Sequence, residues 1–242
     1  MSPPRALVTG VSVGIGRAIA RRLAADGYEV HGTYLSHERE ANALAAELAA
    51  LTLHRVDLAA ADGVESLVAA LPDGPLQSLV NNAGCALEEP LDRFAGDVWE
   101  RTFALNLMAP VALTRALEHR LEGGAVVNVA STDARIGSYS SAAYAASKAA
   151  LVSATRSLAN LLARSHIRVN SVSPGWIDTQ MTTLPQLAAE VAPIGRIGRP
   201  EEIADAVAWL LSSQSSFATG SDLVIDGGFG NVEPVLRREA GM

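Results

Sequence analysis

Short runs of apolar residues alternate along the chain with longer segments in which apolar positions recur with a helical period. The short runs predict strands that are buried on both faces, and the longer segments predict amphipathic helices. This alternation is typical of βαβ units, which build a parallel sheet covered by helices on both faces. The chain is therefore expected to be an α/β protein with one doubly wound, Rossmann-type sheet of about seven strands.

The expected elements follow one another without a linker rich in proline, glycine or serine. The strands are expected at Ala6–Thr9, Glu29–Tyr34, Thr52–Asp57, Ser78–Asn81, Ala125–Ala130, Arg168–Ser173 and Asp222–Ile225. The helices are expected at Gly16–Asp26, Ser36–Ala50, Asp62–Ala70, Asp97–Arg120, Ala142–Arg164 and Pro200–Ser212. We therefore expect a single domain over 1–242, with a cofactor half at about 1–120, a catalytic and substrate half at about 121–231, and a tail at 232–242 that is loosely held or used in assembly.

Composition narrows the class of protein. A single cysteine, Cys85, excludes an internal disulfide and fits a reducing, cytoplasmic location. A net charge of −7 argues against nucleic acid as a partner. No apolar run is long enough to cross a bilayer, the first residues lack the pattern of a signal peptide, and the five histidines show no metal-ligand spacing. A small-molecule substrate is the expected partner, and no metal is expected.

A glycine-rich loop connects the first expected strand to the first expected helix. Residues 9–16 read TGVSVGIG, which is a G-x-x-x-G-x-G spacing. Glycines let the backbone approach a pyrophosphate closely, and the N-terminus of the following helix offers unpaired N–H groups to it. Because the loop lies directly between a strand and a helix, it predicts a dinucleotide site rather than an ordinary glycine-rich turn.

Lys148 is the only lysine in the chain, although the chain has 19 basic residues. It follows Tyr144 by four residues in an expected helix, so the phenol and the ammonium share one helix face. A nearby cation lowers the pKa of a phenol, and a bulkier guanidinium does not replace an ammonium freely. The pair therefore predicts proton transfer by Tyr144.

Several motifs, in their order and spacing, resemble the short-chain dehydrogenase/reductases, and the resemblance spans nearly the whole chain. They are the glycine loop, Asn81-Asn82-Ala83-Gly84, Asn106 within Leu105-Asn106-Leu107, Ser131 thirteen residues before Tyr144, Tyr144-x-x-x-Lys148, Pro174-Gly175-Trp176-Ile177-Asp178-Thr179, Gly198-Arg199-Pro200-Glu201-Glu202-Ile203 and Asp226-Gly227-Gly228. The short, single-domain branch with 3-oxoacyl-carrier-protein reductases and other ketoreductases is the part of the family that the chain resembles.

The resemblance implies four catalytic residues. Tyr144 would protonate a ketone oxygen as hydride arrives at carbon, or act as the base in the reverse direction. Ser131 would hydrogen-bond the substrate oxygen. Lys148, with the positively charged oxidised nicotinamide, would lower the tyrosine pKa and would also hold the nicotinamide ribose. Asn106 would interrupt its helix and help to hold a water that relays protons to Lys148.

The choice of nicotinamide cofactor depends on the end of the second strand. An acid there binds the ribose 2′-hydroxyl of NAD and repels the 2′-phosphate of NADP, and Tyr34 stands at that position. Ser36, with His37 or Arg39, offers partners for a phosphate. Contrary signals are Val13, where many NADP-using relatives carry arginine, and two nearby glutamates at 38 and 40. The balance favours NADP (NADPH) over NAD.

The full cofactor site implied by the resemblance also takes in an adenine contact from Asp57. Its residues are Gly10, Ser12, Val13, Gly14, Ile15, Gly16, Tyr34, Leu35, Ser36, Asp57, Leu58, Asn82, Ala83, Gly84, Tyr144, Lys148, Pro174, Gly175, Ile177 and Thr179.

Other candidates near the site are weaker. Thr132 and Ser138 are alternative donors to Ser131, whereas Tyr139 has alanine at 143 and no lysine partner. Cys85 is expected to be a packed thiol, and Asn128 and Asn170, which lie within expected strands, are expected to satisfy local backbone groups.

The sequence thus predicts an oxidoreductase that moves hydride between NADP(H) and a carbonyl or secondary alcohol, most simply a ketoreductase. An NAD-linked alcohol dehydrogenase of the same family and a non-catalytic nucleotide sensor stay open as alternatives. The resemblance implies a homotetramer or a homodimer, with helices near Asn106 and Tyr144 between subunits. The substrate is open. A short loop from Gln180 to Gly195 is expected to line its pocket with Met181, Leu184, Pro185, Leu187 and Val191.

Overall fold

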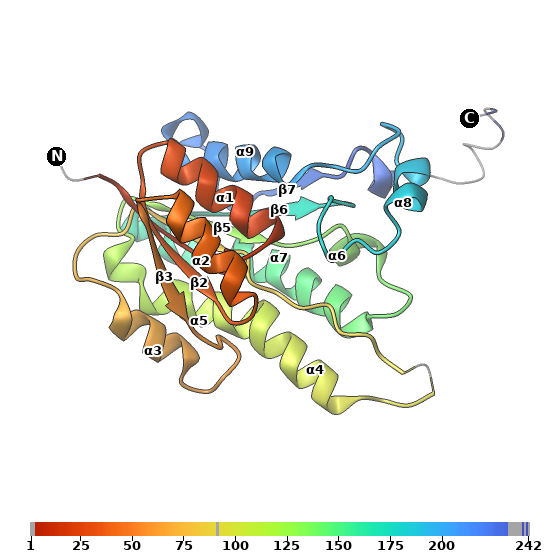
Figure 1. Cartoon of the computed structure of the whole chain (residues 1–242), viewed down its shortest axis with the longest axis horizontal. Helices are drawn as coiled ribbons and strands as arrows, with labels where there is room; N and C mark the ends of the chain where they lie inside the picture. Colours follow the sequence, from red (N-terminus) through yellow and green to blue (C-terminus); the bar gives the residue numbers. More distant parts are fainter. Residues whose placement is uncertain (1–2, 91, 232–238, 240, 242) are drawn as a thin grey trace.

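A seven-stranded parallel sheet forms the centre of the molecule in the computed structural model, which describes residues 3–90, 92–231, 239 and 241 (Figure 1). The strand order is β3-β2-β1-β4-β5-β6-β7. The strands are β1 (Arg5–Val8), β2 (Glu29–Tyr34), β3 (Leu51–Arg55), β4 (Ser78–Asn81), β5 (Ala125–Val129), β6 (Arg168–Pro174) and β7 (Asp222–Ile225). The order reverses between β1 and β4, and in such sheets ligands bind at the carboxyl ends of the strands on either side of this point.

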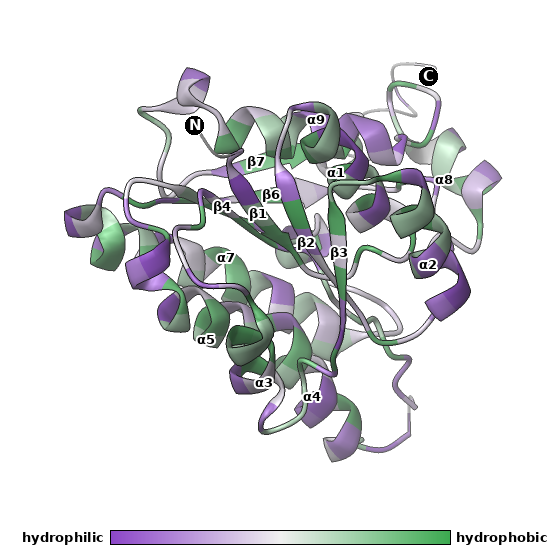
Figure 2. Ribbon diagram, turned by 60° about the vertical axis from the view of Figure 1, so that its left-hand side comes forward, coloured by the Kyte–Doolittle hydropathy of each residue, from purple (hydrophilic) through white to green (hydrophobic). Residues whose placement is uncertain are grey.

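Helices cover both faces of the sheet, as expected for a doubly wound fold (Figures 1 and 2). On one side lie α1 (Gly14–Ala25), α2 (Glu38–Glu47) and α9 (Pro200–Leu211), and on the other lie α3 (Gly63–Ala70), α4 (Gly96–Phe103), α5 (Ala109–Ala116) and α7 (Ala142–Leu162). The chain also forms α6 (Asp133–Ile136), α8 (Pro185–Val191), the π-helix η1 (Ala104–Met108) and the 3₁₀ helices η2 (Glu118–Arg120), η3 (Ala163–Ser165), η4 (Ser213–Ser215) and η5 (Phe229–Asn231).

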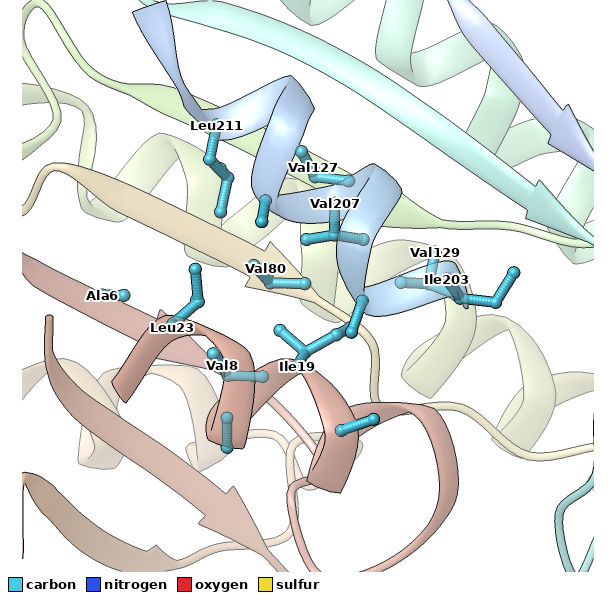
Figure 3. Packing of buried hydrophobic residues seen from close by; sticks show 14 of the residues in the cluster. Ala6, Val8, Ile19, Leu23, Val80, Val127, Val129, Ile203, Val207 and Leu211 are labelled. Carbon is cyan, nitrogen blue, oxygen red and sulfur yellow. The ribbon is translucent and has the colours of Figure 1, made fainter. Parts of the chain in front are cut away.

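The two faces of the sheet carry separate apolar cores. On the α1 and α9 side, Ile19 packs with Val8, Val127, Ile203 and Val207 (Figure 3). Residues on the opposite face of the same strands, such as Leu7, Leu79 and Val126, pack with α5 and α7. Because side chains alternate across a strand, the central strands β1, β4, β5 and β6 supply both cores, whereas β2, β3 and β7 contribute apolar side chains to the α1 and α9 side alone. This two-sided burial fixes the carboxyl edge of the sheet, where the site lies.

The predicted fold class and all seven strands are confirmed, with strand ends displaced by at most two residues. The expected helix over Asp97–Arg120 is wrong as one element, because a π-helical stretch and a 3₁₀ turn divide it into α4, η1, α5 and η2. The expected loop Gln180–Gly195 contains the helix α8, and α6 was not expected at all. The expected tail, 232–242, lies almost entirely outside the described residues.

Two buried asparagines in strands differ in what they bind. Asn170 satisfies backbone groups as expected, because its amide nitrogen donates to the Ala218 carbonyl at 2.8 Å and its oxygen accepts from the Ser221 N–H at 3.1 Å. The same expectation for Asn128 is wrong. Its Oδ1 accepts from Asn81 Nδ2, and its own amide nitrogen donates to Thr155 Oγ1, both at 2.8 Å. Asn128 therefore connects β4 and β5 to α7, the helix that carries Tyr144 and Lys148, through side chains.

Candidate active site

The glycine loop adopts a conformation that leaves room for a phosphate. Gly10 and Gly14 have positive φ angles of 74° and 57°. A Cβ atom at Gly16 would lie 2.0 Å from the Gly10 carbonyl oxygen, so only glycine fits there. The helix α1 begins at Gly14 without a side-chain cap, and a groove of about 560 Å³ opens beside Val13 and Gly14. The first N–H groups of α1 are therefore available to an anion.

A second loop, after β4, is held against the glycine loop by hydrogen bonds. Thr9 Oγ1 accepts from the N–H groups of Asn82 and Ala83, both at 2.9 Å. In return, Asn82 Nδ2 donates to the carbonyls of Thr9 at 2.9 Å and Gly10 at 3.1 Å. The structure thus brings Asn82, Ala83 and Gly84 to the cofactor edge, as the sequence predicts.

The end of β2 carries no acid at the position that selects NAD. Tyr34 is buried there, and its hydroxyl donates to Glu38 Oε1 at 3.5 Å. Ser36 and His37 follow on the surface, with Ser36 Oγ 3.0 Å from His37 Nδ1. His37 precedes the first residue of α2 with a left-handed φ of 57°. A hydroxyl, an imidazole and a helix N-terminus therefore lie together next to Tyr34.

Asp57 and Leu58 lie at the carboxyl end of β3, beside the expected adenine site. Arg101 on α4 donates two hydrogen bonds to the Asp57 carboxylate, at 2.9 and 3.0 Å, and the Ala59 N–H donates a third at 3.0 Å. The Arg101 hydrogen bonds hold the pKa of Asp57 below its usual value. The carboxylate is thus fixed in orientation by α4, a link that the sequence did not indicate.

Tyr144 and Lys148 lie one turn apart on α7. Lys148 is buried, its Nζ lies 5.7 Å from the centre of the Tyr144 ring, and it donates to the Val129 carbonyl at 2.7 Å. Burial lowers the pKa of Lys148 to about 8. An ammonium has three donors, so one is used on β5 and two stay available to a ligand.

Burial dominates the acidity of the tyrosine. It raises the pKa of Tyr144 to about 12, whereas a hydrogen bond with Ser131 acts in the opposite direction. The expectation that Lys148 and the oxidised nicotinamide together depress this pKa stays a prediction; among the protein's own residues, Ser131, Asp133 and Cys85 act on it besides burial. The protein's own residues therefore keep Tyr144 protonated, which suits a proton donor.

Ser131 lies just beyond the end of β5, beside the tyrosine. Its Oγ accepts from the Asp133 N–H at 3.1 Å, which leaves its hydroxyl proton for another acceptor. Thr132 is buried and its N–H donates to the Pro174 carbonyl at 3.0 Å, which joins the ends of β5 and β6. Tyr139, which the sequence places in a loop, is fully exposed.

Asn106 lies within the π-helix η1, so its helix is interrupted as expected. The side chain is fully buried, accepts from the Cys85 N–H and donates to the Cys85 carbonyl, both at 2.9 Å. It also donates to Ser147 Oγ at 3.1 Å, and Ser147 in turn donates to the Tyr144 carbonyl at 2.7 Å. Ser147, which the sequence analysis missed, connects Asn106 to the tyrosine's own turn of helix.

Gly84 separates Asn106 from Lys148. A Cβ atom at this position would lie 3.2 Å from Asn106 Oδ1 and 3.4 Å from Lys148 Nζ. The lack of a side chain therefore keeps the space between the amide and the ammonium clear.

The segment after β6 borders the opposite side of the site. Thr179 reaches the glycine loop, because a Cβ atom at Gly14 would lie 3.2 Å from its Cγ2. Gly175 lies so close to Asp226 that a Cβ atom there would be 2.6 Å from the Asp226 Cβ. Beyond this turn, the exposed side chains of Met181, Leu184 and Leu187 give the chain around α8 an apolar surface.

The described residues contain no cluster of histidine, cysteine, aspartate or glutamate that could hold a metal ion, and none of their helices is long and apolar enough to cross a membrane. At the carboxyl edge of the doubly wound sheet, a loop suited to binding a dinucleotide lies next to a tyrosine, a lysine and a serine. This arrangement defines a nicotinamide-dependent oxidoreductase.

Comparison with known proteins agrees with this class. A family model described as enoyl-(acyl carrier protein) reductase matches residues 10–230. The chain is 38% identical to the 3-oxoacyl-[acyl-carrier-protein] reductase FabG of Escherichia coli, over 92% of this chain and 96% of that protein. It is 34% identical to a (3R)-3-hydroxyacyl-CoA dehydrogenase of Canis lupus familiaris, over 92% and 95%. The protein belongs to the short-chain dehydrogenase/reductase family, and it is an oxidoreductase of that family.

Solved structures give the same result for the fold. The crystal structure of BdcA in complex with NADPH superposes with a TM-score of 0.88 at 36% identity, covering 95% of this chain and 96% of that one. A blue fluorescent protein from a metagenomic library, also in complex with NADPH, superposes with a TM-score of 0.86 at 38% identity, covering 93% and 97%.

Proposed function

We propose that the protein is an NADP(H)-dependent ketoreductase, which interconverts a ketone and a secondary alcohol. The observation that carries the proposal is the juxtaposition of Ser131, Tyr144 and Lys148 at the carboxyl end of β5. In this arrangement one side chain binds the substrate oxygen, one donates the proton and one is a buried cation. The two relatives with reductase or dehydrogenase names, FabG and the 3-hydroxyacyl-CoA dehydrogenase, support the same chemistry.

The residues present fit a dinucleotide. The positive φ angles of Gly10 and Gly14 and the uncapped start of α1 suit a pyrophosphate, which the N–H groups at Val13, Gly14 and Ile15 would bind. Lys148 would hold the nicotinamide ribose with its two remaining donors. Asp57 and Leu58 would border the adenine. When bound, the nicotinamide supplies hydride in reduction and accepts it in oxidation.

The chain's own residues then manage the proton. Ser131 donates its hydroxyl hydrogen to the substrate oxygen and holds the carbonyl against Tyr144. As carbon accepts hydride, the carbonyl π electrons become a pair on oxygen, and that pair takes the phenolic proton of Tyr144. Lys148 stabilises the phenolate that results by its charge. Tyr144 must then recover a proton, and Asn106, through the opening that Gly84 leaves, lies on the side from which a water could relay one from solvent past Lys148 to the phenolate.

The preference for NADP rests on the end of β2. Tyr34 presents no carboxylate there, so it does not repel a 2′-phosphate, and Ser36 and His37 at the start of α2 offer donors to one. Two relatives of known structure, BdcA and the blue fluorescent protein, are described as complexes with NADPH.

Oxidation of NADPH, followed at saturating cofactor against a panel of ketones, tests the proposal. A ketoreductase turns over at least one ketone and prefers NADPH in kcat/KM. An NAD-linked alcohol dehydrogenase would prefer NAD(H) to NADP(H) and would oxidise a secondary alcohol with NAD⁺. A nucleotide sensor would bind NADPH, seen by fluorescence titration, without turning over any carbonyl, and that result would refute the proposal.

The same proposal includes the organisation of the protein. One domain carries both the cofactor half and the catalytic half, because the sheet is continuous from β3 to β7. A homotetramer, or a homodimer, is proposed from exposed apolar residues on helices around the site, such as Met108 on η1 and Leu161 on α7. Mass measured in solution by light scattering tests this.

A reducing, cytoplasmic compartment is proposed from the single free thiol of Cys85.

A further inference from the structure

The carboxylate of Asp57 has one acceptor position left after its hydrogen bonds within the protein. Arg101 Nη1 donates to Oδ2 at 2.9 Å, whereas Oδ1 accepts from Arg101 Nη2 and from the Ala59 N–H, both at 3.0 Å. Each carboxylate oxygen offers two lone pairs, so Oδ1 is saturated and one lone pair of Oδ2 stays open. The Asp57 side chain is 33% exposed, so a ligand can reach it.

The next residue carries a free donor. Leu58 follows Asp57 in the turn after β3, and its N–H has no acceptor among residues 3–90 and 92–231. Leu58 itself is buried. Backbone N–H groups of buried residues normally have a partner in the protein, in water or in a ligand. Two consecutive residues at the carboxyl end of β3 thus supply one open acceptor and one open donor, where a doubly wound sheet binds its ligand.

Backbone and side chain of Asp57 are held by different elements. A Cβ atom at Gly63, the first residue of α3, would lie 2.0 Å from the Asp57 carbonyl oxygen, so α3 packs directly against this turn. The side chain is oriented from α4, because Arg101 binds both of its oxygens. Two parallel hydrogen bonds from a planar guanidinium fix the rotation of a carboxylate, which the single hydrogen bond from Ala59 does not. Arg101 therefore decides where the open lone pair of Oδ2 points.

We propose that Arg101 is a positioning residue that makes the cofactor site select adenine, by holding Asp57 so that Oδ2 accepts a hydrogen bond from the 6-amino group of the base. The Leu58 N–H would donate to N1, the acceptor next to that amino group. Hypoxanthine carries a carbonyl oxygen in place of the amino group and a hydrogen on N1, so it would place acceptor against acceptor and donor against donor. The inference rests on the proposed use of a nicotinamide dinucleotide and adds the residue that enforces the choice of base.

The preference for adenine is measured as a ratio of two dissociation constants, which a general loss of cofactor binding does not change. NADPH and its analogue with hypoxanthine in place of adenine would be titrated at pH 7.5, and binding followed by the fluorescence of the reduced nicotinamide. The proteins are the wild type, Arg101→Gln, Asp57→Ala and the double variant. Arg115→Gln is the matched control, because Arg115 on α5 also pairs with a carboxylate, that of Glu118 at 2.7 Å.

The wild-type protein should bind NADPH about tenfold or more tightly than the hypoxanthine analogue, because a hydrogen bond to a charged acceptor is replaced by a repulsive contact. Arg101→Gln should reduce this ratio to about threefold or less, since the Asp57 carboxylate is then free to rotate. Arg115→Gln should keep the wild-type ratio. A ratio for Arg101→Gln that stays within about twofold of the wild-type value would overturn the proposal.

The double variant separates positioning from direct contact. Asp57→Ala should itself lose the preference for adenine, and adding Arg101→Gln should change the ratio no further, because Arg101 acts through Asp57. A further change in the double variant would mean that Arg101 contacts the base itself, and would refute the positioning role. If Arg101→Gln does not fold, Arg101→Lys replaces it, since an ammonium cannot form the two parallel hydrogen bonds. If the wild-type protein binds no nicotinamide dinucleotide, the proposed function itself fails, whereas normal binding with unchanged ratios refutes only the role of Arg101.

Discussion

Glu89 caps the catalytic helix next to its tyrosine: Glu89 Oε1 accepts a hydrogen bond of 2.6 Å from the N–H of Ala143, the residue before Tyr144. The second carboxylate oxygen, Oε2, accepts from the Trp99 indole at 2.8 Å, so one side chain joins α7 to α4. Ser141, at the start of α7, adds a hydrogen bond to the Leu87 carbonyl at 2.7 Å. The segment at 87–89 therefore positions the first turn of α7, in which Tyr144 lies.

Replacement of Glu89 by glutamine should loosen this turn. Glutamine has one carbonyl oxygen and therefore keeps only one of the two hydrogen bonds, which should cost ~1 kcal/mol of unfolding free energy. Because Tyr144 adjoins the affected N–H, we also expect kcat to fall about tenfold, with little change in the Kd for NADPH. Urea unfolding and steady-state kinetics measure the two effects. Glu88→Gln is the control, and equal behaviour of the two variants would argue against a positioning role for Glu89.

Replacement of Tyr144 by phenylalanine should remove at least ~10²-fold of kcat, since it deletes the general acid. Binding of NADPH, measured by fluorescence titration, should stay close to the wild-type value. Tyr139→Phe is the matched control, because Tyr139 is fully exposed and should lose no activity. Near-normal turnover by Tyr144→Phe would show that another group donates the proton.

Replacement of Lys148 by arginine should be severe even though it keeps the charge. Lys148 is 4% exposed and donates to the Val129 carbonyl, so a longer, planar guanidinium must displace its surroundings. A displacement of about 1 Å near the reacting atoms costs on the order of 10²-fold in rate. The measurement is kcat at saturating NADPH, with folding checked by thermal melting. A folded variant with wild-type kcat would mean that charge alone is required at this position.

Replacement of Tyr34 by aspartate should shift cofactor preference towards NADH. A carboxylate at the end of β2 repels a 2′-phosphate and accepts from a 2′-hydroxyl. The ratio of kcat/KM with NADPH to that with NADH should fall by about tenfold or more. A tenfold change corresponds to about 1.4 kcal/mol of free energy. Tyr34→Asn removes the same ring without adding charge and controls for lost packing. If both variants change the ratio equally, repulsion by charge is not the cause.

Stability should decrease as the pH falls below about 6.5, owing to two histidines at the edge of the sheet. His31 Nδ1 lies 3.1 Å from His54 Nε2, and burial lowers the pKa of both. Because the pKa of each histidine is lower in the folded protein than in the unfolded chain, the unfolded chain binds more protons once the pH is below the unfolded-state pKa. The free energy of unfolding therefore decreases as the pH is lowered through this range. Urea unfolding between pH 7.5 and 5 measures this. The decrease should be smaller in His31→Gln than in His119→Gln, a variant of an exposed histidine.

The central strands were predictable because burial on both faces makes them short, mostly apolar runs, as in Val126 to Val129 on β5. The elements that were missed are those without such a run. The helix α6 is four residues long and α8 is seven, so neither shows a full amphipathic period. Only the resemblance to the family indicated a break in the helix at Asn106, where the π-helix lies.

The candidate site likewise contains some features that the sequence predicted and others that it did not. Tyr144 and Lys148 are recognisable because four residues along a helix bring two side chains together. Contacts across long sequence separations gave no signal in the sequence: Asp57 with Arg101, Glu89 with Ala143, and Asn106 with Cys85. The raised pKa of Tyr144 gave no signal in the sequence for a related reason, since the burial that causes it depends on the whole fold.

Because Lys148 is the only lysine and is buried, the protein should react unusually with amine-directed chemical labels. Apart from its α-amino group, the chain has no primary amine other than Lys148 Nζ, which is almost inaccessible. Amine-reactive dyes and activated supports should therefore attach at the α-amino group of each subunit and leave the active site intact. Any slow second addition should occur at Lys148, and its rate would report how often the interior around β5 and α7 opens.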